Sequence, residues 1–161
     1  MSSAADRDRS NPGDAEFDID GFYQALDNDA NETVSKLTHA QIKREKNDIL
    51  QKLQIKGDAL KIMHARLIGY RYIDFDGGDD VRVGEYVRWI SLKRPEHLVL
   101  TNGAHVCGSI YKGENEYVRC KITRGNGGSR FFVLNIDETI IFQKLTYQEW
   151  IILDALDSLK E

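Results

Sequence analysis

The stretch YVRCKITRGNGGSRFFVLN, residues 117–135, decides the fold. Its first seven residues, 117–123, alternate between apolar and polar side chains, and residues 131–134 form a second short apolar run. A period of two over such runs is typical of β-strands. Between the runs, residues 124–130 include three glycines, which favour a flexible loop. The stretch therefore predicts two strands joined by a hairpin loop.

The same period extends on both sides of this stretch, from Val81 to Lys144. Turn residues separate the runs, and Asn102-Gly103 is a strong hairpin signal because both residues tolerate a positive φ. Five to six short strands at this spacing predict a small antiparallel β-barrel or sandwich. Residues 81–84 and 86–92 together are expected to form one further strand, and residues 97–101, 104–111 and 139–144 form the others.

A long amphipathic helix is expected before the strands, over residues 38–68. Thr38 and Gln41 fit a capping box at its start, and Gly57 is expected to bend or split it. Lys46 and Lys56 interrupt an otherwise apolar heptad seam. Such a seam packs either on the chain's own domain or on a helix of a partner. The second alternative makes the apolar seam residues a candidate partner interface: Ile42, Ile49, Leu53, Leu60, Met63 and Leu67.

A short C-terminal helix is expected after the strands. Thr146 and Glu149 fit a second capping box. The apolar residues that follow recur at spacings of three and predict one apolar face that covers an end or edge of the β-domain: Trp150, Leu153, Leu156 and Leu159. The predicted fold class is therefore α+β.

Charge divides the 161 residues into segments. Residues 1–32 carry a net charge of −7 and are expected to form an acidic tail that is largely disordered or ordered by a partner. Within that tail, the apolar residues of 17–26 predict a short helix that docks either on the chain's own core or on a partner. Residues 33–70 carry +5 and hold the helix, and residues 71–80 carry −3 and are expected to be a linker. Residues 81–161 are expected to form the β-domain with its covering helix.

Candidate chemistry in the sequence is sparse. No phosphate-binding loop, dinucleotide-binding motif or nucleophile elbow occurs, so we expect no enzyme and no cofactor. His97, His105, Cys107 and Cys120 are the right residue types for zinc, but no close pair of cysteines is present. Residues 74–85 match a calcium loop only in part, because Asp79 occupies the place of its glycine. We therefore predict no metal site, and two reduced thiols.

The loop at residues 124–130 supports an alternative function. Arg124 and Arg130 flank it, and Arg119 and Lys121 precede it, so this part of the β-domain could contact a nucleic acid. Residues 81–145 carry a net charge of only +4, which favours the simpler interpretation of a solvated hairpin loop.

A family resemblance covers residues 81–145. The segments that carry it are Val87–Ile90, Leu100–Ala104, Phe131–Leu134 and Thr139–Lys144. The chain resembles minor capsid proteins of nucleocytoplasmic large DNA viruses. That resemblance implies a virion protein that cements larger subunits, with the major capsid protein, other structural proteins or copies of itself as partners. Otherwise we expect a soluble intracellular protein, because no apolar run is long enough to span a membrane.

Overall fold

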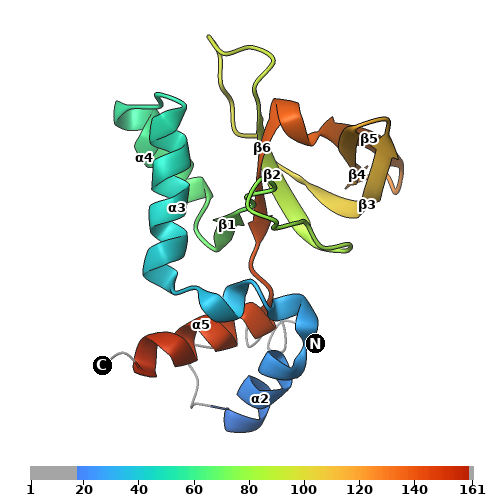
Figure 1. Ribbon diagram of the computed structural model, residues 1–161. Helices are drawn as coiled ribbons and strands as arrows, with labels where there is room; N and C mark the ends of the chain where they lie inside the picture. The colour runs from blue at the N-terminus through green and yellow to red at the C-terminus, as the bar shows by residue number, and fades with distance from the viewer. Residues whose placement is uncertain (1–17, 160–161) are drawn as a thin grey trace. The chain divides into compact units, whose positions relative to one another are not determined.

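The computed structural model describes residues 18–159, which divide into two compact units. The first unit contains the described residues up to Ile49 together with those from Leu145 onward, and the second contains Leu50–Lys144. Four α-helices occur in the described residues (Figure 1): α2 (Ile19–Asp27), α3 (His39–Lys52), α4 (Gly57–Arg66) and α5 (Tyr147–Leu159). The boundary between the units falls inside α3.

The first unit is helical. Helix α2 is followed by two short 3-10 helices, Asp29–Asn31 and Val34–Lys36, and α2 and the second of these pack with α5 around one apolar cluster. The cluster contains Ala25, Val34, Ile42, Leu145, Ile152 and Leu153. The C-terminal helix α5, predicted to cover an end or edge of the β-domain, packs with α2 within the first unit. Residues 18–32, expected as tail, contain ordered helix, and residues 1–17 lie outside the described part of the chain.

Both predicted capping boxes are confirmed. The amide of Thr38 donates to Gln41 Oε1 at 2.9 Å, and the amide of Gln41 donates back to Thr38 Oγ1 at 3.2 Å. At the start of α5, the amide of Thr146 donates to Glu149 Oε1 at 2.9 Å, and the amide of Glu149 donates to Thr146 Oγ1 at 3.1 Å. Each pair satisfies amides that the first helical turn leaves free.

The helix predicted over residues 38–68 is split into two helices. Helix α3 ends at Lys52 and α4 begins at Gly57. Gln54 and Gly57 adopt φ values of 64° and 63°, which are incompatible with a right-handed helix. Gly57, expected to bend or split the helix, therefore lies at the split.

The second unit is built on one six-stranded antiparallel sheet. Its strand order is β1-β6-β2-β3-β4-β5, so β1 and β5 are edges and the sheet is open. The predicted barrel or sandwich is therefore wrong. The strands are β1 (Tyr70–Tyr72), β2 (Tyr86–Ser91), β3 (Ala104–Lys112), β4 (Asn115–Thr123), β5 (Ser129–Asn135) and β6 (Thr139–Lys144).

Three local predictions about the strands also differ from the structure. Residues 81–84 are not a strand, and residues 97–101 contribute only one bridge, between Leu100 and Ile90. Asn102-Gly103 therefore does not close a hairpin. Instead, Gly103 lies against Val87, at a φ of 111°.

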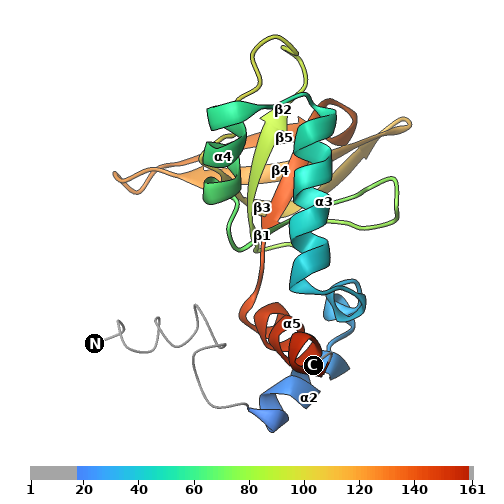
Figure 2. The same cartoon turned by 90° about the vertical axis from the view of Figure 1, so that its left-hand side faces the viewer.

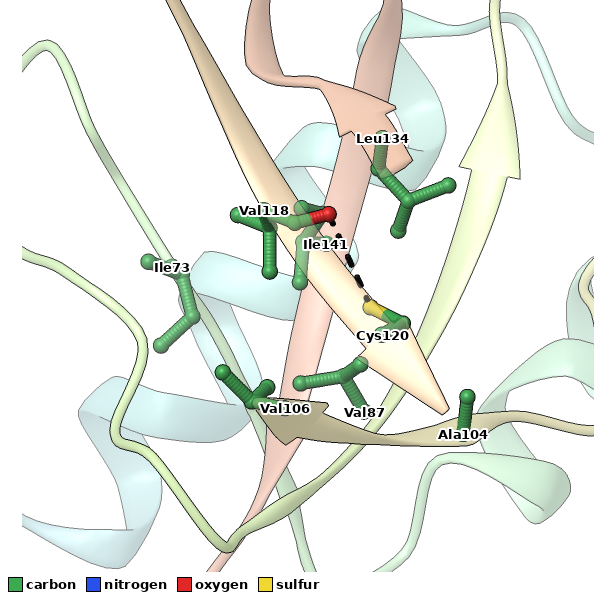
Figure 3. Packing of buried hydrophobic residues seen from close by; sticks show 8 residues of the cluster. All are labelled: Ile73, Val87, Ala104, Val106, Val118, Cys120, Leu134 and Ile141. Atoms are coloured by element: carbon green, nitrogen blue, oxygen red, sulfur yellow. Dashed lines mark hydrogen bonds between the residues drawn. The ribbon is translucent and has the colours of Figure 1, made fainter. Parts of the chain in front are cut away.

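The predicted linker at residues 71–80 is part of the sheet unit. Arg71 lies in β1, is buried, and forms an ion pair with Asp79. Ile73 enters the apolar cluster on one face of the sheet (Figure 3). The other members of that cluster come from β2 to β6: Val87, Ala104, Val106, Val118, Cys120, Leu134 and Ile141. We call this side of the sheet the core face.

Candidate functional site

The face opposite the core face is buried along one half of the sheet. In β1, β2 and β6 its side chains include Tyr70, Ile90 and Phe142, all of which are buried. Arg88 extends from β2 over the Tyr70 ring, 5.1 Å from its centroid, and donates to the carbonyl oxygen of Arg66 in α4 at 2.5 Å. In Figure 1, α4 lies on the side of β1, away from β4 and β5.

The same face is exposed or half-buried along β3, β4 and β5. Residues that pair directly across strands point to the same face, so the register identifies its members. His105 pairs with Lys121, which pairs with Phe131. We name this surface the open sheet face and assign eight positions to it: His105, Gly108, Ile110, Tyr117, Arg119, Lys121, Phe131 and Val133.

The open sheet face combines apolar side chains with cations. Phe131, Val133 and Ile110 are 51%, 50% and 43% exposed. Arg119 places its guanidinium 4.8 Å from the centroid of the Phe131 ring, a cation–π contact. None of the eight positions carries a carboxylate, while Arg119 and Lys121 are basic residues. The surface is therefore suited to an apolar partner that also carries negative charge.

A β-bulge shapes this face at β3. The register shifts between Val106 and Gly108, so Cys107 is the extra residue of β3. Gly108 then pairs with Arg119, and a Cβ at Gly108 would meet no atom within 4 Å. The absence of a side chain there leaves room beside Arg119. At the other end of the face, the His105 ring meets the Tyr86 ring edge-on, at 5.0 Å between centroids.

The two arginines predicted for nucleic-acid contact lie outside the open sheet face. Arg124 is in the hairpin turn, where its amide donates to the carbonyl oxygen of Gly128 at 2.7 Å. Arg130 pairs with Ile122, which places it on the other side of the sheet, and both arginines are exposed. Arg119 and Lys121, which the sequence offered as accompanying cations, lie on the face itself.

The structure does not present the predicted helical seam as one surface. Ile42 belongs to the core of the first unit, and Met63 and Leu67 are buried. Ile49, Leu53 and Leu60 are half-buried. Lys46 is buried as well, and its pKa is lowered by desolvation and by the neighbouring charge of Lys43. The large apolar side chains exposed in this region are instead Ile62 and Ile68.

The histidines and cysteines considered for zinc are not grouped at one place in the structure. Cys120 is buried on the core face, whereas His105 is exposed on the opposite face and His97 is exposed in the connection from β2 to β3. Burial raises the pKa of the Cys120 thiol to about 12. Within residues 18–159, no three His, Cys, Asp or Glu side chains are grouped so that they could hold a metal ion. Neither cysteine is in a disulfide.

The fold and this surface define the class of protein only broadly, as an α+β protein with one open antiparallel sheet. No family model, curated protein or solved structure matches the chain. In the described residues, no helix is long and apolar enough to cross a membrane.

Proposed function

We propose that the protein is a non-enzymatic assembly protein that binds a macromolecular partner through the open sheet face. The observation that carries the proposal is the cluster of exposed apolar side chains around the Arg119–Phe131 contact. Aromatic residues and arginine are enriched at protein interfaces and supply most of their binding hot spots. The proposal does not rest on the helical seam, half of which is buried in the structure.

The strands favour binding because they hold these side chains in place before a partner arrives. Phe131 and Val133 lie on β5, which pairs with β4 along its whole length. A rigid surface loses little conformational entropy on binding. Each of the two side chains is half-exposed, so complete burial contributes on the order of 1 kcal/mol for each.

The resemblance to minor capsid proteins gives the proposal a specific form. In that form, the protein cements larger virion subunits, such as the major capsid protein. The segments that carry the resemblance include β2 and β6, which are neighbouring interior strands of the sheet, and β5, which contributes to the open sheet face. Copurification of the chain with intact particles in a fixed ratio to the major capsid protein tests this form.

A second candidate partner is a single-stranded nucleic acid. Exposed aromatic rings beside cations on a sheet can stack bases while the cations contact phosphates. Phe131, which is exposed, and Tyr117, which is half-buried, provide the rings, and Arg119 and Lys121 provide the cations. In this case a labelled oligonucleotide would bind with an affinity that falls steeply with salt, and Arg119→Ala with Lys121→Ala would reduce that salt dependence. Failure to bind at low salt would exclude this candidate.

Site-specific photo-crosslinking in the cells that produce the protein tests the proposal. A photoreactive residue at position 133 should give one defined product that is crosslinked to a molecule other than a second copy of the chain, which mass spectrometry then identifies. The matched control is position 99, where Val99 is equally exposed, at 49%, but lies outside the open sheet face. Arg119→Glu should remove the product from position 133. Equal products from positions 133 and 99, or none from position 133, would refute the proposal.

A further inference from the structure

We infer that two copies of the chain pair through the outer edge of β5, in antiparallel register about Phe132, so that their sheets join into one. This inference rests on the proposed assembly function and names a second copy of the chain as one partner. It uses the edge of β5, whereas the proposed function uses the open sheet face. The two can therefore fail separately.

The edge of β5 is available for pairing. In the described part of the chain, β5 is the last strand of the sheet and pairs only with β4. An unpaired edge strand presents a row of free amides and carbonyls to solvent. Natural edges are usually blocked by proline, lysine, a bulge or a short strand. β5 has seven residues, contains no proline or lysine, and keeps an uninterrupted register with β4.

The hairpin turn shows which backbone groups of β5 face the edge. The amide of Arg124 donates to the carbonyl oxygen of Gly128, so these two residues form a hydrogen-bonded pair. Such pairs alternate along an antiparallel ladder. The backbone groups of Phe132 and Leu134 therefore point to β4, and those of Phe131 and Val133 point outward. The carbonyl oxygen of Asn135, which points outward in the same alternation, accepts from Thr139 Oγ1 at 2.7 Å.

Self-pairing about Phe132 satisfies these outward groups symmetrically. In a contact between two copies related by a two-fold axis, every residue contact occurs twice. If one residue of the first copy faces a second residue of the other copy, the second residue of the first copy faces the first residue of the other. With Phe132 on the axis, all seven residues of β5 overlap, and Phe131 faces Val133 of the other copy. The outward amides and carbonyls of these two residues then form four hydrogen bonds across the axis.

The side chains next to the two-fold axis also favour a second copy of the chain as the partner of the β5 edge. Phe131 and Val133 are both on the open sheet face, and an aromatic side chain opposite a β-branched one is a stabilising cross-strand pair. The only charge on β5 is Arg130, which would face Leu134 of the other copy rather than a like charge. Pairing would also join two open sheet faces into one continuous surface, which suits a protein that bridges larger subunits.

Mass measurement and amide exchange on the full chain test the inference. Light scattering at increasing concentration should show the mass rising from 18.4 kDa toward twice that value. In parallel, hydrogen exchange at Phe131 and Val133 should slow at least tenfold, while the amides of Phe132 and Leu134 stay protected throughout. A chain that remains monomeric at its highest soluble concentration overturns the inference. So does a dimer in which the amides of Phe131 and Val133 exchange as fast as in the monomer.

Two substitutions at one position provide the matched control. Val133→Pro removes an outward amide without removing a bond to β4, and proline is tolerated on edge strands. It should keep the chain monomeric while Phe132 and Leu134 remain protected, which shows that the hairpin is folded. Val133→Thr retains the amide and should still dimerise. Dimerisation of both variants with equal affinity would contradict the inference, whatever the outcome of crosslinking at the open sheet face.

Discussion

Gly103 lies against Tyr86 and Val87 of β2. Its φ is 111°, and a Cβ there would lie 2.6 Å from the carbonyl oxygen of Val87 and 2.5 Å from the Tyr86 ring. Gly103→Ala should therefore lower the free energy of unfolding by about 2–4 kcal/mol, because backbone strain and overpacking add. Gly113→Ala is the control, since Gly113 has a φ of 66° with no atom near its Cβ. For Gly113→Ala, chemical denaturation should show a smaller loss in the free energy of unfolding, of about 1 kcal/mol. Equal losses for the two variants would contradict the packing argument.

Cys120 makes the stability of the sheet unit depend on alkaline pH. Burial raises the pKa of its thiol from 9.0 to about 12. The folded state therefore holds this proton more tightly than the unfolded state, and the contribution is fully present below pH 9. As the pH rises from 9 toward 12, the free energy of unfolding should fall, because the unfolded thiol ionises first. Denaturation of the wild type and of Cys120→Val across this range measures the effect, and identical slopes for the two would rule it out.

The helix starts show how local sequence sets an element. Thr146→Ala removes the hydroxyl that accepts from the amide of Glu149, so the free energy of unfolding should fall by about 0.5–2 kcal/mol. Ser158→Ala is the control in the same helix, because Ser158 is exposed in its last turn and donates only to a carbonyl oxygen. Thermal or urea denaturation compares the two variants. A loss for Ser158→Ala as large as for Thr146→Ala would show that the capping box is not the cause.

Elements whose signals are local could be predicted from the sequence. Both capping boxes and the strands β2, β3, β4, β5 and β6 follow from spacing and turn residues alone. The break between α3 and α4 was harder to locate, because the heptad pattern continues through Gln54, whose positive φ is unusual for its residue type. β1 was missed because three residues are too few to show a period of two, and pairing with β6 defines it.

At the scale of the whole molecule, the sequence could not show which side chains remain exposed. The helical seam looked like a surface for a partner, yet Ile42, Met63 and Leu67 are buried. The open sheet face depends on long-range register, since Arg119 and Phe131 lie on different strands and meet only when β4 and β5 align. Alternation predicts two faces for each strand but not which face another element covers. That information lies in the tertiary fold.

Hydroxyl-radical footprinting tests most directly whether the open sheet face binds the partner. The chain is oxidised in its native assembly and again after purification, and mass spectrometry compares each residue. Tyr117 and Phe131 should be oxidised several-fold less in the assembly. Tyr111, on the same β3–β4 hairpin but on the other side of the sheet and 71% exposed, should be oxidised equally in both. Protection of Tyr111 or Ile62, with Tyr117 and Phe131 unchanged, would contradict the proposed function.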